Sequence, residues 1–133
     1  AECLIADHIP TYRQLQNIGK IKPATGKDLF RKILLGKNII EQQYREQIEI
    51  ADVAKQCCMS EYHFFRIFKK AFGISPYQYL IDIRLNRALQ DIKQHKNSIS
   101  AIAFETGFAD LASFSKAFSK KFGFPPSQWA KSN

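Results

Sequence analysis

Aromatic and apolar positions recur along the chain in two matching series that lie fifty residues apart. The first series is Phe64, Phe68, Phe72, Gly73, Pro76 and Tyr79, and it returns as Phe114, Phe118, Phe122, Gly123, Pro126 and Trp129. Upstream, Val53 and Ala54 match Ile102 and Ala103 at an offset of 49, so the second copy carries one extra residue, which we place near Gly107. The spacing of four between the aromatic residues is that of an α-helix. The pattern therefore predicts a duplicated helical unit.

Each copy predicts a short helix, a tight turn and a longer helix. Ser60 and Asp110 are expected N-caps, because their side-chain oxygens accept hydrogen bonds from the free amides of a first helical turn. Gly73 and Gly123 follow the last apolar positions, where a left-handed residue ends a helix at no steric cost. The predicted helices cover about 50–57 and 60–72 in the first copy, and about 99–106 and 110–122 in the second.

Two further helices are predicted around the copies. From Lys27 onward, apolar residues at three- and four-residue spacing predict one amphipathic face, within which Gly36 is a candidate for a bend. The members of that face are Leu29, Phe30, Ile33, Leu34, Ile40 and Tyr44. Ser75 and Pro76 open a connecting helix that runs to Gln94. At about 1.5 Å per residue it spans roughly 28 Å, comparable to the ~34 Å between successive major-groove faces of DNA.

These elements give an all-α domain made of two helix-turn-helix subdomains joined by a connecting helix. We expect an N-terminal arm or linker at 1–24, a first helix-turn-helix subdomain at 25–75, the connecting helix at 76–94 and a second subdomain at 95–133. A longer helix presented by a shorter one across a tight turn has the shape that fits a major groove.

The outward faces of the two longer helices carry the candidate chemistry. The first offers Glu61, Tyr62, Phe65, Arg66, Lys69 and Lys70, and the second offers Leu111, Ala112, Ser115, Lys116, Ser119 and Lys120. An exposed aromatic such as Phe65 can meet a thymine methyl group, and Arg66 can bind the N7 and O6 atoms of guanine. Ala112 can give only apolar contact, so we expect the first face to dominate base specificity.

The charge balance fits a polyanionic partner. Lys and Arg number 20 against 12 Asp and Glu, which gives a net charge of +8 at pH 7, and nucleic acid is the leading candidate. The composition alone is equally compatible with basic residues that only keep the surface solvated. On the connecting helix, Arg84 and Arg87 are at least as well explained by ion pairs with Asp82 or Asp91 as by phosphate contacts.

The sequence gives no support for an enzyme, a cofactor or a metal site. His8, His63 and His95 are scattered, and the odd cysteine count with no C-x-x-C spacing indicates neither a disulfide framework nor zinc. Cys58 aligns with Phe108 and is expected in the core, whereas Cys57 is expected in the turn as a candidate reactive thiol. The sequence contains no run of about 18 apolar residues, so it does not predict a membrane span. The cysteine pattern leads us to expect a reducing, cytoplasmic setting.

From about Leu29 to Trp129 the chain resembles the DNA-binding domain of the AraC/XylS family of bacterial regulators. The resemblance rests on Val53-Ala54, Ser60, Phe64 to Lys70, Arg84 to Ala88, Ile102-Ala103, Gly107-Phe108, Phe114 to Phe118 and Phe124 to Trp129. It implies seven helices, with the third and sixth entering adjacent major-groove segments of double-stranded DNA. The base-reading sites it implies are Tyr62, Phe65 and Arg66, then Ala112, Ser115 and Lys116, and we add Lys69 and Lys120 as DNA-binding residues.

The resemblance also implies partners beyond DNA. Most members carry an N-terminal domain that binds an effector and dimerises, a minority are single-domain activators, and RNA polymerase is a possible partner. The chain departs from the family pattern at Ala112 and Lys116, where a polar residue and Arg are common, so the second contact is expected to be weaker. We interpret the chain as a sequence-specific DNA-binding domain of a bacterial transcription regulator. A protein-interaction module with helix-turn-helix geometry and a nonspecific architectural DNA binder remain the alternatives.

Overall fold

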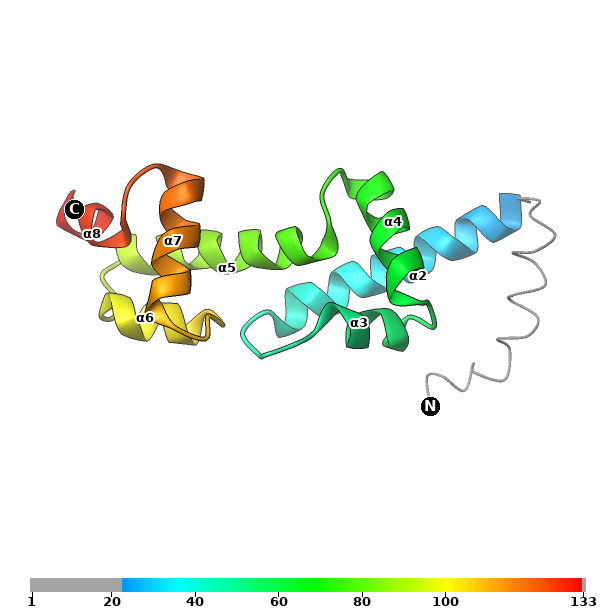
Figure 1. Cartoon of the computed structure of the whole chain (residues 1–133), viewed down its shortest axis with the longest axis horizontal. Coiled ribbons are helices and arrows are strands. Elements are labelled where there is room, and N and C mark those ends of the chain that lie inside the picture. The colour runs from blue at the N-terminus through cyan, green and yellow to red at the C-terminus, as the bar shows by residue number, and fades with distance from the viewer. Residues whose placement is uncertain (1–22, 133) are drawn as a thin grey trace. The chain divides into compact units, whose positions relative to one another are not determined.

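The computed structural model describes residues 23–132, and these form seven α-helices with no strand among them. The expected all-α class is confirmed, whereas nearly all of the expected arm at 1–24 lies outside the described residues. The helices, labelled in Figure 1, are α2 (Pro23–Gln43), α3 (Ile50–Gln56), α4 (Glu61–Phe72), α5 (Pro76–Lys93), α6 (Ile99–Glu105), α7 (Leu111–Phe122) and α8 (Pro126–Ser132).

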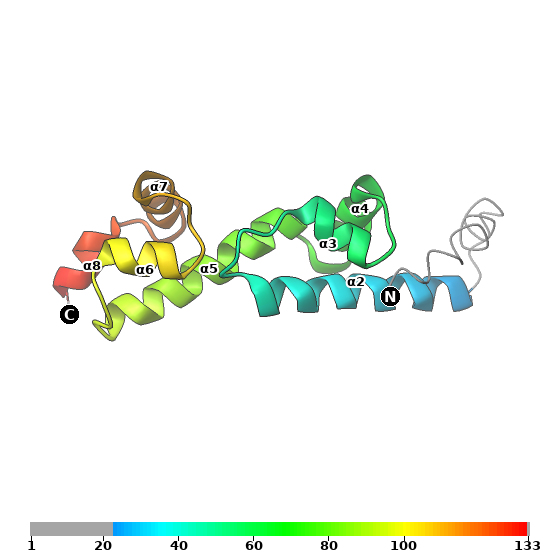
Figure 2. The same cartoon turned by 90° about the horizontal axis from the view of Figure 1, so that it is seen from below.

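The chain divides into two compact units. Among the described residues, the first unit holds 23–42 and Ile48–Tyr77, and the second holds Gln43–Gln47 and everything from Gln78 onward. Helix α5 thus starts in the first unit and continues through the second. Each unit contains one helix-turn-helix pair, α3 with α4 and α6 with α7, and in each pair the longer helix crosses the shorter one (Figures 1 and 2).

The core of the first unit is built by one face each of α2, α3 and α4. The side chains that are almost fully buried are Ile33, Ile40, Val53, Ala54, Cys57, Met59, Phe64 and Phe68. The rings of Phe64 and Phe68 lie 5.6 Å apart between centroids, and those of Phe68 and Phe72 lie 4.7 Å apart. Burying one such ring stabilises the fold by roughly 1.5 to 3 kcal/mol, so the Phe spacing that revealed the repeat is the spacing of the core.

Helix α2 differs from expectation in two ways. It shows no break at Gly36, which is buried where the ring of Phe64 crosses the helix: a Cβ atom there would lie 2.6 Å from Cζ of Phe64. The glycine therefore permits close packing of α2 on α4 and does not mark a bend. The buried stripe runs through Ile33, Gly36 and Ile40, which leaves Phe30 and Leu34 exposed by 49% and 40%.

The second unit repeats this core with α5, α6, α7 and α8. Its buried members are Leu85, Ala88, Ile92, Ile102, Ala103, Phe108, Phe114 and Phe118. Phe118 and Phe122 lie 4.7 Å apart, the same separation as Phe68 and Phe72, and Trp129 of α8 meets Phe122 at 6.3 Å. The repeat seen in the sequence is thus a repeat of packing.

The ends of the two longer helices are set as predicted. The Ser60 hydroxyl oxygen accepts from the backbone N–H of His63 at 3.1 Å, and an Asp110 carboxylate oxygen accepts from that of Ser113 at 2.7 Å. Gly73 and Gly123 both have φ of +84° and end α4 and α7 in the left-handed region. Both helices have a capped N-terminus, a length of 12 residues and a glycine at the C-terminal end, so they correspond residue by residue.

The turn between the helices corrects the expected alignment of the cysteines. The backbone N–H groups of Cys57, Cys58 and Met59 donate to the carbonyls of Val53, Lys55 and Ala54. In the second copy, Thr106, Gly107 and Phe108 donate to Ile102, Phe104 and Ala103, which are the same bonds at an offset of 49. Cys58 therefore corresponds to Gly107, and the extra residue of the second copy is Ala109.

The roles expected of the two cysteines are consequently reversed. Cys57 is buried, and burial together with the neighbouring Cys58 raises the pKa of its thiol to about 11. A thiol with such a pKa is almost wholly protonated at neutral pH, so it is a poor nucleophile. Cys58 is half-buried in the turn with φ of +58°, where the second copy has a glycine.

Candidate nucleic-acid interface

The first candidate face lies on α4, on the side away from Phe64 and Phe68. All four of its predicted DNA-binding residues are exposed: Tyr62, Phe65, Arg66 and Lys69. Tyr62 is 72% exposed and Phe65 is 42% exposed, so both aromatic rings are accessible to a partner. Because they share one side of a rigid, capped helix, these residues form a continuous surface of cationic and aromatic groups.

Two residues of this face contact each other. The Cζ atom of Arg66 lies 5.6 Å from the centroid of the Tyr62 ring, one helical turn earlier. At this distance the guanidinium is attracted by the electron-rich face of the ring.

The second candidate face lies on α7 and has fewer side chains that can contact a base. Ala112, Lys116 and Lys120 are exposed, whereas Ser115 is half-buried. Lys121, which follows Lys120, forms an ion pair with Asp82 at 3.5 Å. The face thus combines two lysines with small side chains and lacks an aromatic residue like Phe65.

Two titratable groups flank the faces. Partial burial, and then the positive charges of Arg66 and Lys32, lower the pKa of His63 below its usual range. The backbone hydrogen bond from Ser113 likewise lowers the pKa of Asp110. At neutral pH His63 therefore adds no charge to the α4 face, and Asp110 keeps its negative charge at the positive end of the α7 dipole.

A buried arginine organises the turn of the second unit. Arg84 is only 7% exposed, and its guanidinium lies 5.9 Å from the ring of Phe108. Its Nε and Nη2 atoms donate to the backbone carbonyls of Tyr44 and Glu46 at 2.8 and 2.9 Å. Gln47 donates in turn to the carbonyl of Gly107 at 2.8 Å. The loop Gln43–Gln47 is thereby tied to α5 and to the turn after α6.

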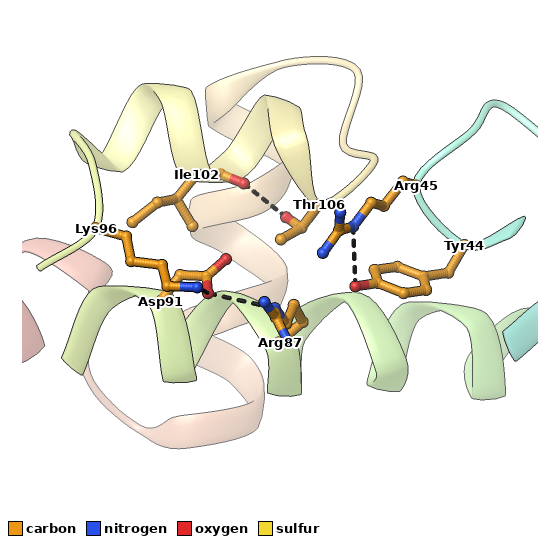
Figure 3. Close-up of polar contacts among 7 residues, drawn as sticks. All are labelled: Tyr44, Arg45, Arg87, Asp91, Lys96, Ile102 and Thr106. Carbon is orange, nitrogen blue, oxygen red and sulfur yellow. Dashed lines mark hydrogen bonds and ion pairs between the residues drawn. The ribbon is translucent and has the colours of Figure 1, made fainter. Parts of the chain in front are cut away.

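The expected ion pair is confirmed for Arg87. Arg84 binds backbone carbonyls, as described above, while Arg87 pairs with the buried Asp91 at 3.3 Å. Figure 3 shows this pair on α5 beside Thr106, whose hydroxyl donates to the carbonyl of Ile102 at 2.8 Å, with Lys96 near the same carboxylate at 3.9 Å. The sequence held one signal for a structural Arg84, since it occupies the same helical stripe as Leu80 and Ala88.

The described residues bear on two other kinds of functional feature, a membrane-spanning helix and a metal site. Across residues 23–132, no helix has both the length and the apolar character needed to cross a membrane. Within the same residues, no group of three or more His, Cys, Asp or Glu side chains is placed to hold a metal ion.

Two helix-turn-helix units with cationic outer faces on their longer helices define a class of DNA-binding protein. Residues 53–132 match a family described as "Helix-turn-helix domain". The chain is 35% identical over 95 residues to the Msm operon regulatory protein of Streptococcus mutans, covering 71% of this chain and 34% of that protein. The chain spans about a third of the length of the curated relatives it matches.

Solved structures agree with these relatives. A transcriptional regulator with an AraC-type DNA-binding domain from Chromobacterium violaceum is 28% identical, with a TM-score of 0.68, covering 76% of this chain and 90% of that one. The DNA-binding domain of AdpA, a global transcriptional factor solved in complex with a target DNA, has the same fold: 23% identity, a TM-score of 0.68, and coverage of 78% and 90%.

The chain belongs to the AraC-type helix-turn-helix family, as the sequence resemblance indicated. The domain is therefore of the DNA-binding kind found in bacterial transcription regulators, and this family of domains is not an enzymatic one.

Proposed function

We propose that α4 and α7 are the recognition helices, and that each inserts its exposed face into the major groove of one segment of an asymmetric DNA site. The observation that carries this proposal is the repetition of one capped, 12-residue helix with its aromatic stripe buried and its cationic side exposed. A 12-residue helix presented across a tight turn fits the width of a major groove. The complex of the AdpA domain with its target DNA supports the same use of this fold.

In the first segment, Arg66 is proposed to bind a guanine and Phe65 to contact a thymine methyl group. Arg66 and Phe65 are neighbours on one exposed face, so they would read adjacent or nearby base pairs. Tyr62 lies one turn before Arg66 on the same face, and Lys69 lies one turn beyond Phe65, where its ammonium group suits a phosphate.

In the second segment, Lys116 and Ser115 are proposed to supply the polar contacts, with Ala112 giving apolar contact and Lys120 a phosphate contact. A lysine is a point charge without the two-pronged geometry of arginine, so it selects a base less sharply. The half-burial of Ser115 restricts it further. We therefore propose that the second unit contributes affinity more than base selectivity.

We propose that an effector-binding domain and a protein partner also take part in the function of the whole protein. Since the matched part of this chain covers only about a third of these relatives, an effector-binding domain outside the present sequence would supply the regulatory signal. Contact with RNA polymerase would convert DNA binding into a change in transcription. Binding to chromosomal DNA would place the protein in the bacterial cytoplasm.

Selection of bound sequences from a randomised duplex pool tests the proposal. The chain should enrich one asymmetric site, and Arg66→Ala should weaken binding to it by about 1 to 3 kcal/mol while relaxing one base position. Arg31→Ala, which removes one exposed positive charge from α2, is the matched control and should leave every base preference unchanged. Uniform weakening by Arg66→Ala would make Arg66 a phosphate contact and contradict its assigned role.

Salt dependence separates this function from a protein-interaction module. Neutralisation of phosphates by lysine and arginine releases counterions, so the affinity for random duplex DNA should fall steeply as salt rises. A chain that does not bind random duplex at low salt would contradict the proposal.

A further inference from the structure

We propose that Tyr62 is a positioning residue for Arg66: its ring holds the guanidinium in the direction from which it reads a base, and Tyr62 does not itself select that base. This inference rests on the proposed function of α4 and adds the source of its selectivity. It concerns one contact, that of the Arg66 Cζ atom with the Tyr62 ring at 5.6 Å.

The backbone under this contact is well fixed. Ser60 is the N-cap and α4 begins at Glu61, so Tyr62 lies in the first turn and Arg66 lies four residues later on the same side of the helix. Residues four apart on a helix are neighbours. Both side chains are exposed, so the core holds neither of them, and each is free to be oriented by its neighbour on the helix.

The cation–π contact has a direct consequence for base recognition. An unrestrained arginine has many rotamers and loses that freedom when it binds. Attraction to the Tyr62 ring would reduce the number of Arg66 rotamers beforehand, and it uses none of the guanidinium N–H groups that a guanine would accept from. Restraint of this kind favours the correctly placed base over others, because a displaced base cannot recruit another rotamer at low cost.

The second unit provides an internal comparison. The positions that correspond to Tyr62 and Arg66 at the offset of 50 are Ala112 and Lys116, on a helix with an equivalent cap, an equal length and an equal terminal glycine. Alanine offers no ring, and an ammonium group has no planar edge. We therefore assign the proposed difference in selectivity to the replacement of the Tyr62 and Arg66 pair by Ala112 and Lys116.

A double-mutant cycle on the full 133-residue chain tests the inference. Dissociation constants are measured for the selected site and for its variants at the base pair that Arg66→Ala relaxes. Tyr62→Phe keeps the ring and should retain selectivity within about twofold, whereas Tyr62→Leu removes it and should lower selectivity about two- to fivefold, the size of an exposed cation–π contact. In the Arg66→Ala background, Tyr62→Leu should have no further effect on selectivity.

Four results would overturn the inference. An equal loss from Tyr62→Leu with and without Arg66, or relaxation of a different base pair, would show that Tyr62 contacts DNA itself. Unchanged selectivity in Tyr62→Leu would show that Arg66 needs no positioning. If Arg66→Ala relaxed no base pair at all, the proposed function of Arg66 would fail, and the inference with it. Because Tyr62 is 72% exposed, these variants should keep the thermal unfolding midpoint of the wild type.

Transfer of the pair to the second unit gives an independent test. Ala112→Tyr combined with Lys116→Arg should sharpen selectivity at one base pair of the second segment more than Lys116→Arg alone. Equal selectivity in the double and single variants would contradict a positioning role for the ring.

Discussion

The Nε atom of Arg84 donates a hydrogen bond to the backbone carbonyl of Tyr44, forty positions earlier in the chain, at 2.8 Å. The same guanidinium binds the carbonyl of Glu46 at 2.9 Å, so one buried side chain satisfies two backbone acceptors of the loop Gln43–Gln47. Residues on both sides of this loop belong to the first unit, while the loop belongs to the second. Arg84 therefore attaches this segment to the second unit, together with the hydrogen bond from Gln47 to the carbonyl of Gly107.

Loss of this arginine should destabilise the protein. Arg84→Met should lower the free energy of unfolding by about 2 to 3 kcal/mol, because hydrogen bonds to a charged group are removed and two carbonyls lose their partner. Arg84→Lys should lie between Arg84→Met and the wild type, since an ammonium group cannot reproduce the planar fork. Urea unfolding measures both, and a change below about 0.5 kcal/mol in Arg84→Met would contradict the assigned role.

The packing of α2 on α4 predicts opposite effects at two glycines of the same helix. Gly36→Ala should destabilise by about 1 to 3 kcal/mol, because its Cβ atom would meet the ring of Phe64. Gly26→Ala is the matched control: nothing lies within 4 Å of a Cβ atom there, so the helix should gain up to about 1 kcal/mol. Stabilisation by both substitutions in thermal unfolding would disprove the close contact at Gly36.

His63 predicts a pH dependence of stability. Its pKa is lowered by burial and by the charges of Arg66 on α4 and Lys32 on α2, so the unfolded chain, with a histidine pKa of about 6.5, takes up a proton more readily than the folded chain. The free energy of unfolding should therefore fall as the pH drops below about 6.5. His63→Gln should show a smaller fall over the same range, and an identical slope in the two proteins would exclude His63 as its source.

Thiol labelling tests the corrected assignment of the cysteines. In a chain carrying Cys3→Ser and Cys58→Gly, the second of which introduces the residue found at the corresponding position Gly107, only Cys57 can be alkylated. Since the pKa of its thiol is raised to about 11, labelling near pH 8 should be about a hundredfold slower in the folded chain than in urea. Equal labelling rates in the folded chain and in urea would show that Cys57 is exposed in the turn and contradict its burial.

The sequence predicted the regular parts of this fold because they depend on local signals. Helix ends at Ser60, Gly73, Asp110 and Gly123 are set by residues that act within one turn, so caps and breakers located them to within a residue. The buried Phe stripes followed from helical periodicity. The outward positions Tyr62, Phe65 and Arg66 followed from the same periodicity, since a residue that is not on the buried stripe faces the solvent.

The parts that sequence reasoning missed depend on contacts between distant residues. Gly36 resembles a helix breaker until the ring of Phe64, 28 positions later, lies against it. The contacts of Arg84 with two backbone carbonyls were not predicted, because no sequence pattern distinguishes one backbone carbonyl from another. The predicted positions of Cys57 and Cys58 were interchanged because the second copy carries its extra residue, Ala109, after the turn. The turns therefore align at an offset of 49, and the offset of 50 applies only from the next helix onward.

Hydroxyl-radical footprinting of the selected site is the most direct test of the claim that both units read DNA. The wild-type chain should protect two unlike patches on one face of the duplex, about one helical turn apart. Lys116→Ala should weaken protection of the second patch, while Arg66→Ala should weaken mainly the first. Protection confined to one patch, with no response to Lys116→Ala, would contradict the account and leave α7 as a structural support.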